Sequence, residues 1–335
     1  MPSLIESATE EQVIDHGERA AVVRSRMRFS GAPGLFVERS HAPGGATRPP
    51  VLLVHGFAQN RYTWHTSRRS MTAWLAARGW DVWNLELRGH GHNREAGGSG
   101  AESFADYVQD VVTILGEMPD RPFVVGHSLG GAVLYAAATV APGAMRGVVG
   151  IGALYHFAQD NLALNLICRL THSFRDAPWM ASVQVRTRLA GALLGKLYGV
   201  SDIAGYASPI SGWWPGSVEP DLLAERLELG FDWTSVRVWL EMSRWGATGR
   251  FEYDEAWAQT DVPVLVCLGD RDHLMPVRDG RVAFARSGSA DKRLLVFDDY
   301  THEVHWGHLD LILGRLAPRH VWTAVEAWMA ERSGD

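Results

Sequence analysis

A pentapeptide of the form Gly-x-Ser-x-Gly, GHSLG at residues 126–130, constrains the fold of this chain more than any other feature. It directly follows the apolar run 123–125 and precedes small residues at 129–140, so we expect a strand, a sharp turn and a helix. Such a turn strains the backbone of Ser128, and the flanking glycines remove side chains that would collide. This setting predicts that the Ser128 hydroxyl stands above the edge of a sheet. A glycine-rich turn with an incidental serine is the alternative.

Short apolar runs alternate with helical patterns on both sides of this turn. Residues 21–29 and 35–37 have the pattern of an antiparallel hairpin or of a pair of edge strands. The alternation predicts an α/β fold, with a mostly parallel sheet covered by helices on both faces. Its buried strands are expected at 51–54, 82–85, 123–125, 148–151, 262–265 and 294–297.

The alternation stops near residue 153 and resumes at residue 262. We therefore expect a core formed by 1–153 and 259–335, with a helical cap at 154–258 on the C-terminal edge of the sheet. Aromatic walls in the cap would favour an apolar substrate, while packing inside the cap accounts for its tryptophans equally well. These tryptophans are Trp179, Trp213, Trp214, Trp233, Trp239, Trp245 and Trp257.

A serine that attacks a carbonyl needs two fixed backbone N–H donors for the oxyanion. The N–H of Leu129, at the start of the helix after Ser128, is expected to be one of them. The second is expected from the loop after the first core strand, HGFA at 55–58, where Phe57 is preferred and Ala58 is the alternative.

The base that activates Ser128 is expected in the loop after the last strand, which contains His302, His305 and His308. His308 is preferred because it stands in WGHLD, just before an apolar helical pattern. Three histidines at a spacing of three also suggest a metal site, but surface or cap contacts are the preferred interpretation. We expect no metal and no cofactor.

Two carboxylates compete for the role of the triad acid, in the sequence GDRD at 269–272. Asp272 stands three residues after the glycine and is preferred as the partner of the imidazole. Asp270 is expected to cap the turn or to bond the loop backbone. Asp310 is expected to steady the loop or the helix start rather than to serve as the acid.

The composition restricts partners and location. The net charge is −6 and no dense basic cluster occurs, so nucleic acid is not expected as a partner. The two cysteines, Cys168 and Cys267, do not form a disulfide framework, and the acidic start lacks the pattern of a signal peptide. No apolar run is long enough to span a bilayer, so we expect a cytoplasmic protein without stable membrane insertion; the oligomeric state stays open.

The chain resembles the α/β-hydrolase superfamily over most of its length, as an esterase- or lipase-like serine hydrolase. In part it is also similar to acid lipases and polyhydroxyalkanoate synthases. The resemblance implies an eight-stranded sheet and a cap after the sixth strand, and it supports Asp272 and His308 as triad members. The synthases have cysteine where this chain has Ser128, and the serine favours hydrolysis. A serine at this position also excludes those α/β-hydrolases whose nucleophile is an aspartate. The motifs are LVHGF at 53–57, LRGHG at 87–91, GHSLGG at 126–131, GDRD at 269–272 and WGHLDLILG at 306–314.

These features predict a serine carboxylic ester hydrolase that acts through an acyl-enzyme on an apolar small-molecule ester. Acyl transfer, thioester hydrolysis or peracid formation would use the same triad. A non-catalytic ligand-binding α/β-hydrolase is the alternative from another class. A dinucleotide oxidoreductase is disfavoured, because the glycines at 147–152 have the wrong spacing and lie within a strand.

Overall fold

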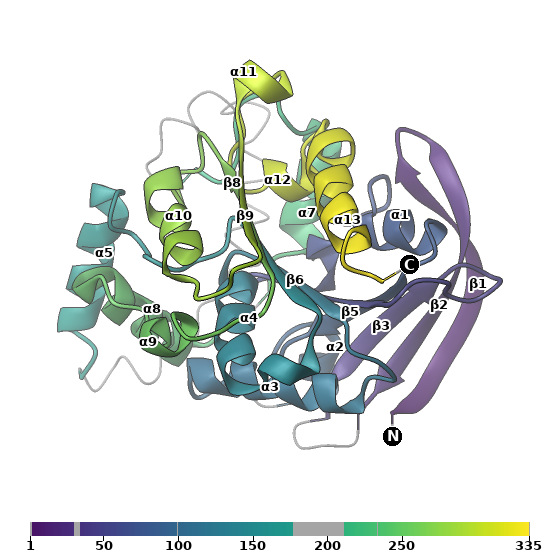
Figure 1. The fold of residues 1–335 in the computed structure, drawn as a ribbon, viewed down its shortest axis with the longest axis horizontal. Coiled ribbons are helices and arrows are strands. Elements are labelled where there is room, and N and C mark those ends of the chain that lie inside the picture. The colour runs from purple at the N-terminus through teal and green to yellow at the C-terminus, as the bar shows by residue number, and fades with distance from the viewer. Residues whose placement is uncertain (1, 30–33, 99, 177–210, 233, 335) are drawn as a thin grey trace.

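The computed structural model describes residues 2–29, 34–98, 100–176, 211–232 and 234–334. Within these residues the chain forms a single sheet with helices on both faces (Figure 1). The predicted α/β fold with a mostly parallel sheet is therefore confirmed.

The described residues form a sheet of nine strands in the order β1-β2-β3-β5-β4-β6-β7-β8-β9. Strands β4 to β9 pair in parallel, whereas β1, β2 and β3 are antiparallel to their neighbours. The bounds are β1 Ser3–Asp15, β2 Glu18–Arg28, β3 Phe36–His41, β4 Pro50–Val54, β5 Asp81–Glu86, β6 Phe123–His127, β7 Gly147–Ile151, β8 Val264–Gly269 and β9 Lys292–Phe297.

The expected number of eight strands is wrong, and the additional strand is β1. It lies at the edge of the sheet, where it pairs with β2. Most of its side chains are exposed. An exposed edge strand needs neither an apolar run nor a regular alternation of apolar and polar residues, so the periodicity of the sequence did not indicate it.

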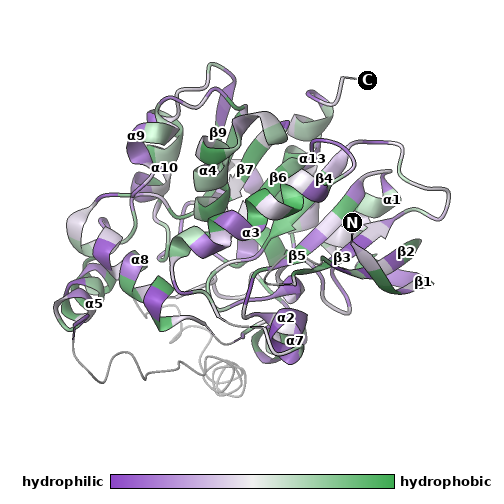
Figure 2. Ribbon diagram, turned by 90° about the horizontal axis from the view of Figure 1, so that it is seen from below, coloured by the Kyte–Doolittle hydropathy of each residue, from purple (hydrophilic) through white to green (hydrophobic). Residues whose placement is uncertain are grey.

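Helices cover both faces of the sheet because alternate side chains of a strand point to opposite sides. Leu52 and Val54 of β4 pack into one core with α3 and α4, while Val51 and Leu53 pack into a second core with α1 and α13. In Figure 2, α4 is mostly hydrophobic, whereas the outer helix α3 alternates between hydrophobic and hydrophilic residues. The helices of the core are α1 Met71–Ala77, α2 Gly91–Glu95, α3 Phe104–Glu117, α4 Leu129–Val140, α10 Val277–Arg286, α11 Asp299–His302, α12 Asp310–Leu313 and α13 Thr323–Ala330.

Helix α3 begins at a capping box. The hydroxyl of Ser103 accepts the N–H of the third helical residue, Asp106, whose carboxylate accepts the backbone N–H of Ser103 in return. This capping box satisfies N–H groups that a helix start leaves without an intrahelical acceptor.

Between β7 and β8 the described residues form helices α5 Leu162–Ser173, α7 Pro220–Leu229, α8 Val236–Thr248 and α9 Asp254–Trp257. This agrees with a helical insertion, although the boundaries 154 and 258 stay a prediction. Trp245 and Trp257 are buried, which supports the packing explanation for these two tryptophans. Trp179 and Trp233 lie outside the described residues.

Both cysteines are free and buried, as expected for a chain without a disulfide framework. Among the described helices, none combines the length and the apolar character that crossing a membrane requires.

Candidate active site

Ser128 occupies the sharp turn between β6 and α4. Its backbone has φ 55° and ψ −124°, a conformation that residues with side chains rarely adopt. The flanking glycines are required by close packing: a Cβ on Gly126 would collide with the backbone of Gly130 and Gly131, and one on Gly130 would collide with the carbonyls of Val54 and His55. The strand, turn and helix predicted around Ser128 are therefore present.

Asp272 and His308 form a buried pair at the same edge of the sheet. The Nδ1 of His308 and the Oδ2 of Asp272 are 2.7 Å apart, and the side chains are 2% and 0% exposed. The other carboxylate oxygen of Asp272 accepts the N–H groups of Leu274 and Met275 at 2.9 and 2.8 Å. With both of its oxygens engaged, the carboxylate holds the imidazole in one orientation.

Two contacts bring this pair beside Ser128. The N–H of Ser128 donates to the carbonyl of Ile151 at 3.0 Å. The next residue, Gly152, lies so close to the pair that a Cβ there would be 3.1 Å from the Nδ1 of His308 and 3.3 Å from the Oδ2 of Asp272. The Nε2 of His308 is buried and has no hydrogen-bond partner in the described part of the chain, so it is available to a nucleophile.

His127, the residue before Ser128, also contacts the predicted base. Its ring centroid lies 4.5 Å from that of His308, and its Nε2 is 3.1 Å from the carbonyl oxygen of His308. Burial, and after it the neighbouring His308, lower the pKa of His127 well below the usual value. His127 is therefore neutral and donates to the loop that carries the predicted base.

The loop after β4 approaches Ser128 directly, as an oxyanion loop requires. A Cβ on Gly56 would be 3.0 Å from the Cβ of Ser128. The N–H groups of Phe57 and Leu129 donate no hydrogen bond to any other described residue. Ala58 has a positive φ of 56°, so the backbone of this loop is strained beside the turn.

A hydrogen-bonded relay connects this loop to α7. Arg226 is 2% exposed and donates from Nη2 to the hydroxyl of Thr63 at 3.1 Å. That hydroxyl donates to the Oε1 of Gln59 at 2.9 Å, and the same oxygen accepts the N–H of Gly56 at 3.3 Å. Burial lowers the pKa of Arg226 to about 9. The sequence patterns missed Gln59 and Arg226, because nothing in their spacing connects two segments so far apart in the chain.

Asp310 ties the loop that carries His308 to the segment before α7. One carboxylate oxygen accepts the N–H of Gly307 at 2.6 Å and that of Trp214 at 2.8 Å, and the other accepts the hydroxyl of Ser217 at 2.7 Å. Burial raises the pKa of Asp310 to about 7. The expectation that Asp310 steadies the loop is confirmed, and the segment it reaches was not foreseen.

The three histidines of the last loop do not converge on one point. His302 lies 3.9 Å from Asp298, His305 lies 2.6 Å from Asp270, and His308 pairs with Asp272. Asp270 also accepts the N–H of Trp306, so it bonds the loop backbone as expected.

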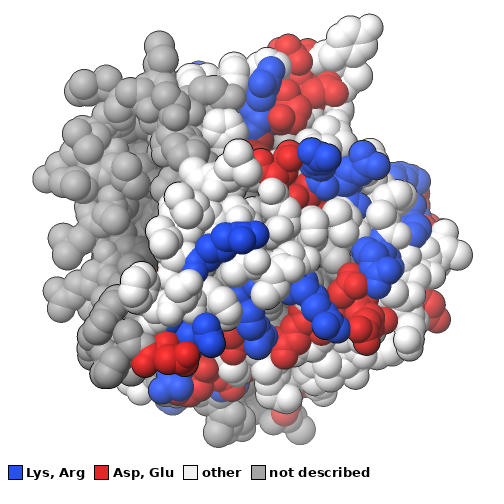
Figure 3. All heavy atoms as spheres, turned by 90° about the vertical axis from the view of Figure 1, so that its left-hand side faces the viewer, with Lys and Arg blue, Asp and Glu red and all other residues white. Residues whose placement is uncertain are grey.

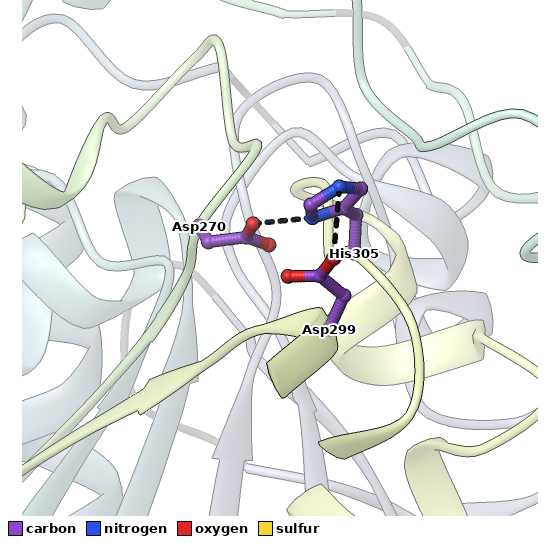
Figure 4. A group of neighbouring side chains, drawn as sticks. All are labelled: Asp270, Asp299 and His305. Atoms are coloured by element: carbon purple, nitrogen blue, oxygen red, sulfur yellow. Dashed lines mark hydrogen bonds and ion pairs between the residues drawn. The ribbon is translucent and has the colours of Figure 1, made fainter. Parts of the chain in front are cut away.

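One group with the composition of a metal site lies near this loop (Figure 4). Donor atoms of Asp270, Asp299 and His305 lie within 4.8 Å of one another. The Nε2 of His305 is 3.4 Å from Asp299, so each ring nitrogen of this histidine faces a carboxylate. Asp299 is exposed, and ion pairing alone accounts for the arrangement.

Comparisons with known proteins agree with this architecture. Residues 49–309 match the model of the family described as alpha/beta hydrolase fold. A monoacylglycerol lipase from Mycolicibacterium smegmatis is 25% identical over 289 residues, which cover 84% of this chain and 91% of that protein. Epoxide hydrolase B from Mycobacterium tuberculosis is 34% identical over 111 residues, which cover 33% of this chain and 30% of that protein.

Solved structures give the same fold at lower identity. A monoacylglycerol lipase from Paleococcus ferrophilus superposes with a TM-score of 0.62 at 18% identity, covering 89% of this chain and 99% of that one. A soluble variant of monoglyceride lipase from Saccharomyces cerevisiae superposes with a TM-score of 0.63 at 17% identity, covering 92% of this chain and 95% of that one. At these identities the likeness shows the fold alone.

Proposed function

The chain belongs to the α/β-hydrolase fold family and is a hydrolase of that family, and on this premise we propose that it is a serine carboxylic ester hydrolase that acts through an acyl-enzyme. One observation carries the proposal: the buried hydrogen bond between Asp272 and His308 leaves the Nε2 of His308 without a partner in the described chain, close to the strained turn at Ser128. A ligand-binding protein has no need of this combination.

In the proposed reaction the Oγ of Ser128 attacks the ester carbonyl carbon while the Nε2 of His308 takes its proton. The N–H groups of Phe57 and Leu129 stabilise the oxyanion, and the carboxylate of Asp272 stabilises the imidazolium. The imidazolium then gives its proton to the leaving alcohol. Water repeats the two steps on the acyl-enzyme, releases the acid and regenerates Ser128.

For the substrate we propose an ester with an apolar acyl chain, of the monoacylglycerol type. The monoacylglycerol lipase from M. smegmatis supports this class, because the aligned segment covers most of both chains. An aromatic contact at the oxyanion loop also supports it: the ring of Phe57 lies 5.8 Å from that of Trp239 in α8. Aromatic walls exclude water and favour apolar groups. The cytoplasmic location stays a prediction.

A fluorophosphonate probe tests the nucleophile. We expect one covalent adduct, located on Ser128 by mass spectrometry, and a loss of about 10⁴-fold or more in kcat for p-nitrophenyl esters in Ser128→Ala. Ser333→Ala is the matched control, since Ser333 and Ser128 are both 8% exposed. An adduct on another residue, or unchanged turnover in Ser128→Ala, refutes the mechanism.

A graded series of esters tests the substrate class. We expect kcat/KM to rise from p-nitrophenyl acetate to longer acyl chains, and 1-monoacylglycerols to be cleaved. Competition between water, alcohols and hydrogen peroxide for the acyl-enzyme separates hydrolysis from acyl transfer and peracid formation. A preference for acetate over every longer chain contradicts the apolar substrate.

A further inference from the structure

Helix α5 is apolar on two sides, and among the described residues only one of these sides is packed. Leu164 and Cys168 are buried, and they lie on the side that faces α8. The approach to α8 is close, because a Cβ on Gly246 would collide with Cys168, and the amide of Asn165 donates to the carbonyl of Gly246 at 2.8 Å. This side anchors α5 to the rest of the molecule.

The other side of α5 carries large apolar side chains in solvent. Four of them recur at intervals of four residues, which places them along one face of a helix. An apolar face of this size is unusual on a protein surface and marks an interaction site, whereas single exposed apolar residues do not. The α5 face, as we call it, consists of Leu162 (83% exposed), Leu166 (57%), Ile167 (41%), Leu170 (52%) and Phe174 (54%).

The acids that flank α5 are both paired with arginines: Asp160 lies 3.2 Å from Arg278, and Asp176 lies 3.4 Å from Arg175. Helix α5 contains no acidic residue, and it carries Arg169 next to the apolar side chains. The Nε of Arg169 bonds the side chain of Asn165 at 2.8 Å, and its guanidinium has no ion pair with a described carboxylate. Figure 3 shows the side of the molecule on which α5 and α8 lie, where basic and acidic side chains are interspersed around a largely uncharged area.

We propose that the α5 face binds the surface of a membrane that contains anionic lipids. An amphipathic helix of this kind lies in the plane of the interface, with its apolar side chains among the acyl chains and its cations at the lipid phosphates. The α5 helix is 12 residues long and too short to span a bilayer, so the contact is peripheral. Its purpose, uptake of a lipid ester from the bilayer, rests on the proposed function; the binding itself does not.

The test uses the full-length protein with Ser128→Ala, which prevents hydrolysis, and sedimentation with phosphatidylcholine vesicles that contain about one third phosphatidylglycerol. We expect the protein to bind these vesicles, and to bind pure phosphatidylcholine more weakly. The double variant Leu166→Gln and Leu170→Gln should reduce the partition coefficient about tenfold or more. Glutamine keeps the helix propensity, so α5 should stay folded.

The matched control is Val140→Gln with Tyr300→Gln, which removes two exposed apolar side chains (56% and 94% exposed) outside the α5 face. It should bind vesicles like the parent. Arg169→Gln should reduce binding to the anionic vesicles and leave binding to pure phosphatidylcholine unchanged.

Turnover of p-nitrophenyl acetate, measured with Ser128 restored, separates this inference from the proposed function. The double variant should hydrolyse this soluble ester at the parent rate. No vesicle binding by the parent, or equal binding by the double variant, overturns the inference while leaving the function intact. A fall of several degrees in Tm for the double variant shows that the chain itself covers this face, and a parent dimer that becomes monomeric shows that a second copy does; either result overturns the inference too.

Discussion

Two aspartate–histidine pairs lie side by side in this protein, and they differ in what surrounds them rather than in their own geometry. Asp272 and His308 are 2.7 Å apart, and Asp270 and His305 are 2.6 Å apart. In each pair the carboxylate bonds the Nδ1 of the ring, and its other oxygen accepts backbone N–H groups. The distance between acid and imidazole therefore does not tell which pair does chemistry.

The second ring nitrogen and the burial distinguish the two pairs. The Nε2 of His308 has no partner in the described residues and lies in a side chain that is 2% exposed, whereas the Nε2 of His305 faces Asp299 at 3.4 Å in a side chain that is 21% exposed. A general base needs a ring nitrogen that is free to take the proton of the nucleophile. A carboxylate that solvent screens stabilises the imidazolium only slightly. The two pairs are therefore distinguished by their surroundings, which fit the proposed catalytic role at His308 and an ion pair near the surface at His305.

Asp272→Asn should have the largest effect on activity of these substitutions. Asparagine keeps the shape but removes the charge that stabilises the imidazolium and selects its tautomer, so we expect kcat to fall about 10³–10⁴-fold. The measurement is turnover of p-nitrophenyl butyrate, with thermal unfolding to verify the fold. Activity within about tenfold of the parent would remove Asp272 from the triad.

Gly152→Ala should disturb the buried pair without changing either partner. The new Cβ would be 3.1 Å from the Nδ1 of His308, and φ at Gly152 is +53°, which strains a residue with a side chain. We expect kcat to fall about tenfold to a hundredfold, because a small displacement of the base is costly. Gly143→Ala, where a Cβ would contact nothing within 4 Å, is the control and should behave like the parent. Equal kinetics in the two variants would contradict the close packing at the pair.

Asp310→Asn should change how the stability of the protein depends on pH. Because burial raises the pKa of Asp310 to about 7, the folded protein favours the neutral carboxyl, and this contribution to stability is complete below about pH 4 and is lost as the pH rises toward 7. The free energy of unfolding of the parent should therefore fall over this range by up to about 4 kcal/mol relative to Asp310→Asn, which does not titrate there.

Chemical denaturation of both proteins at several pH values measures this difference. A parallel pH dependence in the two proteins would show that Asp310 is already ionised at low pH. We also expect kcat of Asp310→Asn to fall about tenfold, because the hydrogen bonds from Gly307 and Trp214 to the Asp310 carboxylate hold the loop that carries His308.

Asp270→Asn should have the smallest effect. The side chains of Asp270 and His305 are 19% and 21% exposed, and the stability of such a pair is about 1 kcal/mol or less. We expect kcat to stay within about threefold of the parent, with a slightly lower Tm. If this variant is inactive while Asp272→Asn is active, the assignment of the two acids is reversed.

Much of the fold followed from local patterns. The turn at Ser128 and the parallel strands were predicted because strand periodicity and glycine sterics act within a few residues. Strand β1 was missed, since its side chains are mostly exposed and its stability comes from pairing with β2. The relay from Arg226 to Gln59 was also invisible, because the partners come from distant segments.

Local sequence patterns were enough to predict a strained serine between a strand and a helix, with acids and histidines in the loops that an α/β sheet brings to the same edge. The three-dimensional structure was needed to show which aspartate–histidine pair is buried beside Ser128, which segment Asp310 reaches, and which face of α5 is exposed. The physical reason is that local backbone preferences depend on neighbouring residues, whereas the energy of a charge or an apolar side chain depends on everything packed around it.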